Sequence, residues 1–219
     1  MAGIGTDDGK AEKALESVAR YLETEHGIML LQPAYTEYHK ELGEVSSYPM
    51  GYKENAAVFC HNNPWIIAAE TVLGHGDRAF SLYSRIAPAY REEISDLHKM
   101  EPYVYSQMIA GRDAKNFGQA KNSWLTGTAA WNFHVISQWI LGIKPDWEGL
   151  KIDPCIPHTW DGYTVRRSFR GARYDIEIRN PGHVCRGVAR MTLNGQAVEG
   201  NVLPVLPAGT EAKVVVELG

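Results

Sequence analysis

The feature that most restricts the fold is a change in apolar periodicity after Gly142. Before this residue, apolar side chains recur at helical spacing, and after it short runs alternate between apolar and polar residues. The alternating runs are separated by Gly171, by residues 180–182 and by the pair Asn194-Gly195. Asn-Gly between two such runs is a strong hairpin signal. The sequence therefore predicts a helical part followed by a small β domain.

The helical part is predicted to contain several helices joined by long irregular segments. Residues 6–8, Thr-Asp-Asp, are candidate caps for the first helix, and Gly27 is its predicted end. The segments 28–64 and 89–122 show no clear period, and long loops of this kind are more often functional than idle. The predicted helices cover residues 9–25, 65–73, 77–87 and 127–142.

Proline and glycine mark a boundary between two domains. Residues 146–159 are rich in both and are interpreted as a linker or strap. They separate a helical domain, residues 1–145, from a small antiparallel β domain, residues 160–219. The predicted fold class is therefore α+β with more than one domain.

Charge and cysteine content exclude several classes of protein. With 22 basic and 26 acidic residues, the net charge of -4 gives no broad positive field to attract nucleic acid or an acidic membrane. No apolar run approaches the roughly 20 residues that cross a bilayer, and the first residues lack the pattern of a secretory signal. The three cysteines are far apart, which favours a reduced, cytoplasmic setting and indicates neither a disulfide framework nor a metal site.

Polar groups are concentrated in residues 51–65, GYKENAAVFCHNNPW, just before a predicted helix. Lys53 and Glu54 are adjacent, so on an extended segment one side chain can serve the fold while the other serves a site. The alternative is a solvated ion pair in a loop. His61 is either a ligand-binding group or a structural histidine with satisfied hydrogen bonds, and the residues alone leave both open.

The segment NSWLTGTAAW places Thr126, Gly127 and Thr128 at the start of an apolar helix. A helix start offers unpaired N–H groups and a positive dipole end, which together bind anions. Glycine allows an anion to approach the backbone, and a threonine hydroxyl adds a donor. The alternative is that one of the threonines only caps the helix. The P-loop pattern is absent from the sequence.

The segment EPYVYSQ places Tyr103, Tyr105 and Gln107 on one side of an extended segment. Alternating rings and an amide suit a sugar site, because rings stack on the apolar face of a sugar and amides bind its hydroxyls. The alternative is an aromatic core strand with a surface glutamine. Glu101 has the chemistry of a general acid, but a proline follows it and no second carboxylate is fixed nearby.

Together these segments resemble one family, the cellobiose and N,N'-diacetylchitobiose phosphorylases, in their C-terminal part. The similarity covers nearly the whole chain, with a slight departure at Ala56-Ala57, where the family often has a glycine. It implies the last helical hairpins of an (α/α)6 toroid followed by a small antiparallel β-sandwich domain. The resemblance is carried by GYKENAAVFCHNNPWIIAAETVLGHGDRAF, EPYVYSQMIAG, NSWLTGTAAW, LGIKPDWEGLKIDPCIP and the β tail.

The resemblance implies an inverting phosphorolysis of a β-linked disaccharide. Inorganic phosphate, as co-substrate and without a cofactor, attacks the anomeric carbon while a carboxylic acid on the opposite face protonates the leaving oxygen. By motif match, the phosphate is bound by His61, Thr126 and Gly127, and hydroxyls of the non-reducing sugar are bound by Lys53, Glu54 and Gln107.

The family's proton donor, an aspartate in a motif of the type A-D-W-N-D, has no counterpart in this sequence. No catalytic residue is therefore assigned, and the chain is predicted to be a C-terminal fragment or subunit that is inactive alone, because general-acid catalysis contributes about 10²–10⁴ in rate. The expected partners are sugar and phosphate, with self-association or a chain that carries the missing hairpins. Two alternatives are a remnant that only binds sugar, phosphate or another protein, and a hydrolase on the same toroid.

Overall fold

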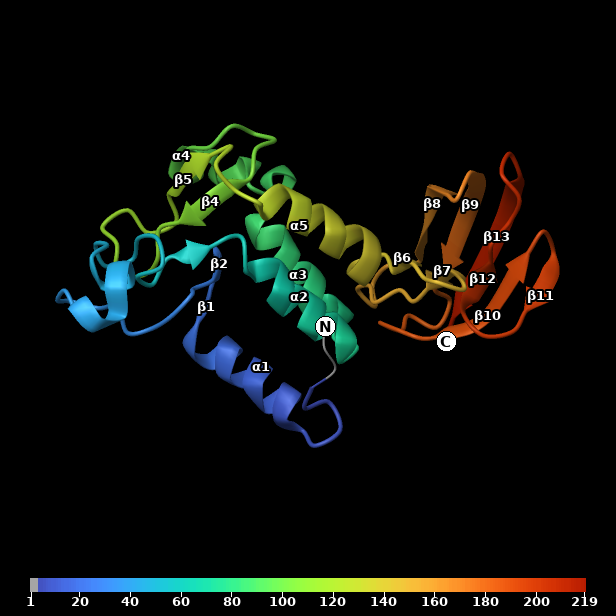
Figure 1. The fold of residues 1–219 in the computed structure, drawn as a ribbon, viewed down its shortest axis with the longest axis horizontal. Helices are drawn as coiled ribbons and strands as arrows, with labels where there is room; N and C mark the ends of the chain where they lie inside the picture. Colours follow the sequence, from blue (N-terminus) through green and yellow to red (C-terminus); the bar gives the residue numbers. More distant parts are fainter. Residues whose placement is uncertain (1–3) are drawn as a thin grey trace. The chain divides into compact units, whose positions relative to one another are not determined.

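The computed structural model describes residues 4–219, which form two compact units. Unit 1 comprises the described residues up to Leu73 together with Ser81–Val135, and unit 2 comprises Gly74–Phe80 and Ile136–Gly219 (Figure 1). Helix α3 (Gly76–Ile86) contributes residues to both units. Helices and antiparallel strands occur together, which confirms the predicted α+β class.

Unit 1 is built from helices and short strands, with long connections between them. Its α-helices are α1 (Lys10–Tyr21), α2 (Asn63–Val72), α4 (Ser95–His98) and α5 (Thr128–His134), and its 3-10 helices are Lys40–Ser46, Pro88–Tyr90 and Glu92–Ile94. Helix α5 continues directly as a π-helix, Val135–Ile140, whose residues after Val135 belong to unit 2.

Helix α1 ends earlier than the sequence predicts. Strand β1 (Glu23–Thr24) turns back to pair with β2 (Gly27–Ile28), and Gly27 lies in this hairpin with φ 126°. The predicted helix end at Gly27 is therefore wrong. At the start of the helix, a carboxylate oxygen of Asp8 accepts a hydrogen bond from the N–H of Lys10 at 3.1 Å, so one candidate cap does bind a backbone donor there.

Helix α2 begins at Asn63, two residues before the predicted start, because Pro64 fits the first turn of a helix. The buried Asn63 amide fixes the segment that precedes the helix. Its oxygen accepts the N–H of Ile28 at 2.8 Å, and its nitrogen donates to the carbonyls of Ile28 and Phe59 at 3.0 and 3.1 Å. The polar stretch around His61 is thus held to strand β2.

The segment 89–122, predicted to be irregular, contains two paired strands. Strand β4 (Ser106–Ile109) pairs antiparallel with β5 (Ala120–Ser123) and with β3 (Val58–Phe59). The prediction failed because these strands are only two to four residues long, too short for alternation to be visible. A buried cluster adjoins the sheet and consists of Ala57, Met108, Ala110 and Ala114, with Tyr52 and Phe59 packed against it.

Unit 2 holds two β-sheets, with strand orders β11-β10-β13-β9-β8 and β12-β7-β6. Their pairs are antiparallel except that β13 runs parallel to β9, so the antiparallel expectation is wrong for that pair. Strand β7 lies within residues 146–159. The strands are β6 (Ile143–Pro145), β7 (Gly149–Ile152), β8 (Gly162–Phe169), β9 (Ala172–Arg179), β10 (Val188–Leu193), β11 (Gln196–Val198), β12 (Val202–Pro204) and β13 (Glu211–Leu218).

The alternation of apolar and polar residues in the β tail gives the larger sheet one buried face. Alternate residues of β9 and β13 are buried in unit 2. The hydroxyl of Tyr174 on β9, a fully buried residue, donates to the carbonyl of Pro204 at 3.2 Å and so joins β9 to β12. The predicted hairpin is confirmed, because Asn194 and Gly195 have φ 50° and 83° and connect β10 to β11.

Among the helices of residues 4–219, none has both the length and the apolar content needed to cross a bilayer.

Candidate functional site

Strand β4 brings three of the predicted site segments together in unit 1. The ammonium group of Lys53 donates a hydrogen bond to the side-chain oxygen of Gln107, and the amide of Asn122 donates to the same oxygen at 2.9 Å. Gln107 belongs to β4, Asn122 to β5, and Lys53 to a tight turn in which it adopts φ 52°. A non-glycine residue in this region is uncommon. The turn therefore directs the Lys53 ammonium group to the sheet.

Glu54 does not pair with its neighbour Lys53 in the part of the chain that the structure describes. Its Oε2 atom is buried and has no hydrogen-bond partner. The negative charge of Glu54 is the largest cause that raises the pKa of Tyr48 above the usual tyrosine value. A buried acceptor without a donor is costly and calls for an explanation. The hydroxyl of a bound ligand would satisfy this oxygen.

The imidazole of His61 lies against the backbone of Gly127. A methyl group added at Gly127 would lie 3.0 Å from Cε1 of the ring and 3.3 Å from Nδ1. The ring is also next to helix α2, since its centroid is 6.1 Å from the ring of Trp65, which in turn contacts Trp131 of α5 at 5.6 Å. The imidazole is therefore placed at the start of α5 by both helices.

The hydroxyl groups of the two threonines are hydrogen-bonded to each other and, through Thr128, to strand β4. The N–H of Thr128 donates to the hydroxyl oxygen of Thr126 at 3.0 Å, and the Thr128 hydroxyl donates to the carbonyl of Ser106 at 3.2 Å. Because the Thr128 proton is used in this way, Thr126 donates in the contact between the two hydroxyls. Gly127 is the N-cap residue of α5 and Thr126 precedes it, so the Thr126 hydroxyl accepts the first N–H of the helix from outside the cap position. To donate to an anion, the Thr126 hydroxyl must turn away from Thr128.

Two hydrogen bonds to backbone carbonyls of β4 tie the two ends of the site to one strand. The N–H of Cys60 donates to the carbonyl of Gln107 at 2.9 Å, and Thr128 bonds Ser106 on the same strand, β4. His61 follows Cys60, so the imidazole and the Gln107 amide are both fixed by β4. Burial raises the pKa of the Cys60 thiol to about 12, so this cysteine is an unreactive core residue.

The predicted aromatic row does not form. Tyr103 lies in a turn with 80% of its surface exposed, whereas the hydroxyl of Tyr105 is 3.4 Å from that of Tyr83. Burial raises the pKa of Tyr105 above the usual tyrosine value. Of Tyr103, Tyr105 and Gln107, only Gln107 is hydrogen-bonded to another predicted site residue, Lys53, among the residues described, because the strand begins only at Ser106.

Glu101 is not placed as a general acid. It is exposed, and one carboxylate oxygen accepts the indole N–H of Trp124 at 3.2 Å and the hydroxyl of Ser123 at 3.4 Å. Its own backbone N–H and the Trp124 indole hold the pKa of Glu101 below its usual range. The carboxylate therefore stays ionised at neutral pH.

Sequence reasoning missed Asn122, Trp124 and the anchoring role of Glu101. Asn122 could not be found because its position opposite Gln107 depends on the register of two short strands. Trp124 carried one signal, its place between Asn122 and the threonine pair in NSWLTGTAAW. The unusual backbone that displays its ring becomes visible only in the structure.

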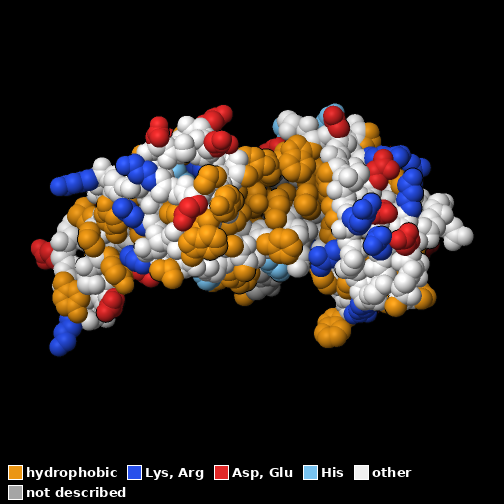
Figure 2. Space-filling model, turned by 90° about the horizontal axis from the view of Figure 1, so that it is seen from above, with side chains coloured by type: hydrophobic (Ala, Val, Ile, Leu, Met, Phe, Trp, Pro, Cys, Tyr) orange, Lys and Arg blue, Asp and Glu red, His pale blue; other side chains and the backbone are white. Residues whose placement is uncertain are grey.

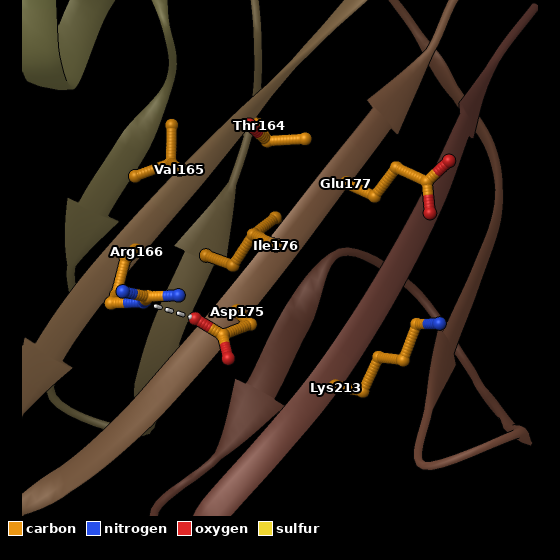
Figure 3. A pocket seen from close by; sticks show the side chains of 7 residues that line it. All are labelled: Thr164, Val165, Arg166, Asp175, Ile176, Glu177 and Lys213. Carbon is orange, nitrogen blue, oxygen red and sulfur yellow. Dashed lines mark hydrogen bonds and ion pairs between the residues drawn. The ribbon is translucent and has the colours of Figure 1, made fainter.

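A depression on the larger sheet of unit 2 is a weaker candidate for a site. It has a volume of about 440 Å³ and carries side chains of both charges (Figure 3). Arg166 and Asp175 pair across it at 2.7 Å, and both are more than half exposed. A solvent-facing sheet commonly carries such pairs, and they contribute little to stability. The depression is lined by Thr164, Val165, Arg166, Asp175, Ile176, Glu177 and Lys213.

A metal centre is not indicated either. Within residues 4–219, no group of three or more His, Cys, Asp or Glu side chains is placed to hold a metal ion. The polar groups of unit 1 instead form a candidate site with an ammonium group, a carboxylate oxygen without a hydrogen-bond partner and an imidazole beside a glycine, a set whose chemistry suits a ligand rich in oxygen atoms.

Comparison with known protein families places the chain in one of them. The chain belongs to the glycosyl hydrolase 94 superfamily, whose catalytic domain matches residues 1–142. Residues 143–186 match the C-terminal domain of glycosyl hydrolase family 65. The resemblance found in the sequence motifs is confirmed.

Curated relatives include several phosphorylases. The chain is 39% identical over 219 residues to N,N'-diacetylchitobiose phosphorylase of Vibrio proteolyticus, covering 100% of this chain and 27% of the relative. It is 40% identical over 210 residues to the Vibrio furnissii enzyme of the same name (96% and 26% covered) and 33% identical over 218 residues to solabiose phosphorylase of Paenibacillus borealis (100% and 28% covered). The chain thus spans about a quarter of the length of these relatives.

The solved structures add no comparable evidence. A family 92 α-mannosidase of Bacteroides thetaiotaomicron aligns with 95% of this chain and 22% of its own at 13% identity. The TM-score of 0.34 is too low to define a shared fold.

Proposed function

We propose that this chain is the C-terminal portion of an inverting phosphorylase that cleaves a β-linked disaccharide of the cellobiose or N,N'-diacetylchitobiose type with inorganic phosphate. The observation that carries the proposal is the contact between His61 and Gly127, beside a strand whose Gln107 binds Lys53 and Asn122. An anion-binding group and a set of groups that bind hydroxyls thus adjoin each other. Phosphate is the co-substrate, and no further cofactor is required.

The proposed roles follow the chemistry of each group. At one end of the site, phosphate is bound by the His61 imidazole, the backbone at Gly127 and the Thr126 hydroxyl, once this hydroxyl turns away from Thr128. Phosphate then attacks the anomeric carbon, and the leaving oxygen receives a proton from the opposite face of the sugar. The hydroxyls of the non-reducing unit are bound by Lys53, Glu54 and Gln107.

The proton donor is proposed to come from outside this sequence, which has no A-D-W-N-D motif. Glu101 does not replace it, because its carboxylate stays ionised. The relatives are about four times as long, which leaves room for a segment that carries the acid. Without it the chain is expected to be inactive, since an alkoxide leaving group needs general-acid assistance worth about 10²–10⁴ in rate.

The finer architecture belongs to the same proposal. Residues 1–145 are taken as the last hairpins of an (α/α)6 toroid, 146–159 as a strap and 160–219 as a β-sandwich domain. Uncovered apolar surface supports it. A groove of about 300 Å³ lies between α1 and α2, and a separate gathering of hydrophobic side chains is seen on the face in Figure 2. We propose that a second copy, or a chain carrying the missing hairpins, covers the groove.

Reconstitution tests the proposed activity. The chain is mixed with a separately expressed N-terminal portion of the Vibrio proteolyticus relative, and N,N'-diacetylchitobiose and cellobiose are supplied with phosphate. We expect a sugar 1-phosphate from the mixture and from neither part alone. Activity of the chain alone would contradict the assignment of the acid to a missing segment.

Two controls separate the rival functions. A hydrolase would release free sugar at the same rate with and without phosphate, whereas a phosphorylase requires phosphate.

Calorimetry on the chain alone tests a simple binding remnant: phosphate binding should be lost in His61→Ala and Thr126→Ala. Sugar binding that is independent of both substitutions, with no phosphate binding in the parent, would favour the remnant.

A further inference from the structure

The junction between β5 and α5 has an unusual backbone. Asn122 and Trp124 both adopt left-handed conformations, with φ 57° and 68°. A bulky side chain in this region is a rare and strained arrangement, which persists where the surrounding structure enforces it and which is concentrated at functional sites. Asn122 is explained by its hydrogen bond to Gln107. The Trp124 side chain instead makes its hydrogen bond to Glu101, an exposed residue outside the sheet.

The strained backbone displays the ring of Trp124. This side chain is 71% exposed, so it adds little to the core of unit 1. Its indole N–H is held by Glu101 at 3.2 Å, and the same carboxylate oxygen accepts the neighbouring Ser123 hydroxyl at 3.4 Å. The edge of the ring is thereby anchored while most of its surface stays open. A ring that is both fixed and accessible is suited to binding.

Trp124 lies in the chain between the two ends of the site. Two residues before it, Asn122 bonds the Gln107 amide, and two residues after it, Thr126 begins the segment in which Gly127 contacts His61. The junction that carries the indole thus connects the segment that holds the Gln107 amide with the segment that contacts the His61 ring.

We propose that the Trp124 indole is a stacking platform for a pyranose ring of the bound disaccharide, and that Glu101 is a positioning residue that holds the platform. The inference rests on the proposed function and adds to it a residue that selects the ligand. A β-linked pyranose presents axial C–H groups on one face, and an aromatic ring offers a large apolar surface with a negative face that attracts them. Flat β-linked sugars should be favoured over α-linked ones of the same composition.

The test uses the full chain and titrates it with cellobiose and N,N'-diacetylchitobiose in calorimetry and tryptophan fluorescence. Maltose serves as the α-linked comparison. We expect Trp124→Ala to weaken β-disaccharide binding by about tenfold or more and Trp124→Phe to retain most of it. The matched control is Trp147→Ala, because Trp147 is 92% exposed and lies in unit 2. Trp147→Ala should bind the disaccharides as tightly as the parent chain and show the same change in fluorescence on binding.

A glycine variant separates a binding role from a structural one. Trp124→Gly relieves the left-handed backbone, so we expect the melting temperature to rise while sugar binding falls. A structural tryptophan would instead lower the melting temperature when removed. Glu101→Gln retains an oxygen that accepts the indole N–H and should preserve binding, whereas Glu101→Ala should weaken it.

The outcomes are distinct. If the parent chain binds neither disaccharide, this inference is overturned, whereas the proposed function is decided by the reconstitution with the N-terminal portion. If the parent binds and Trp124→Ala binds equally well, only the inference is overturned. Loss of self-association in Trp124→Ala with unchanged sugar affinity would also overturn it, because the indole would then belong to a protein interface.

Discussion

At the scale of single residues, the absence of a side chain at position 127 lets the imidazole of His61 reach the start of α5. Gly127 has an ordinary φ of -81°, so its conformation does not require glycine. The requirement comes from the ring, 3.0 Å from where a Cβ would lie. The sequence singled out both residues, but their contact joins positions 66 residues apart and could not be read from either motif.

Gly127→Ala should therefore displace the imidazole and reduce phosphate affinity, with little effect on the backbone. We expect a loss of about tenfold or more, since one charge-assisted hydrogen bond is worth about 1.5–3 kcal/mol. Calorimetric titration with phosphate measures it. Gly182→Ala is the matched control, because the added carbon would meet only Val184 at an ordinary 3.7 Å. Equal phosphate affinity in the two variants would contradict the placement of the anion.

Glu54→Gln tests the buried carboxylate oxygen at the other end of the site. The substitution keeps the shape and removes the charge of a half-buried carboxylate whose buried Oε2 has no hydrogen-bond partner. We expect the melting temperature to stay the same or rise, because a buried acceptor without a donor is unfavourable. Disaccharide affinity should fall by about tenfold, measured by calorimetry. A drop in stability with unchanged affinity would show that Glu54 serves the fold.

At the scale of elements, a buried cluster of His26, Arg91 and His98 joins the β1–β2 hairpin to the segment before β4. Nδ1 of His26 is 2.8 Å from an Arg91 nitrogen, so the neutral ring accepts this bond. Nε2 of His26, Nε of Arg91 and Nδ1 of His98 are buried and have no hydrogen-bond partner among the described residues, although Nε2 of His26 lies 3.4 Å from a carboxylate oxygen of Glu25. Burial, followed by the charge of Arg91, lowers the pKa of His26 and lowers that of His98 to about 4. Both histidines are therefore neutral near pH 7.

This cluster predicts a loss of stability in acid. Between the unfolded pKa of about 6.5 and the folded value of about 4 for His98, the unfolded state binds more protons. The free energy of unfolding should therefore decrease as the pH is lowered through this window. For His98 the decrease is on the order of 3 kcal/mol once the whole window has been crossed. Nearby Glu25, 3.4 Å from His26, reduces the effect on that ring.

Urea denaturation between pH 7 and pH 4 measures this dependence. His98→Gln should flatten the curve, whereas His39→Gln, at a partly exposed histidine of the same unit, should leave its slope unchanged. A parent curve that does not decline below pH 6.5 would show that the two rings take up protons without penalty.

Elements differ in how far the sequence could define them. The hairpin at Asn194-Gly195 was predictable because both residues tolerate the positive φ that its turn requires. Strands β4 and β5 were not, because four-residue strands with polar members give no clear period. Since these two strands set the Gln107–Asn122 contact, the candidate residues could be named while the frame that holds them could not.

At the scale of the whole molecule, the apolar groove between α1 and α2 leads to a prediction about assembly. Leu15 and Val18 of α1 line it together with Ile66 and Ala69 of α2, and its volume is about 300 Å³. Apolar surface of this kind is normally covered by another part of the chain or by a partner. The chain spans about a quarter of its relatives' length, so a covering element has room in the proteins that carry it.

In isolation, we expect the chain to bury this groove by self-association. Sedimentation velocity over a hundredfold concentration range should show a shift from monomer to larger species. Ala14→Glu places a charge in the groove at an exposed position of α1 and should weaken association by about tenfold or more, since burying an unpaired charge is costly. Ser17→Glu, exposed on the same helix but outside the groove, should have no effect. A parent that sediments as a monomer at every concentration would remove the groove as an interface between copies and leave the longer partner chain as its only proposed cover.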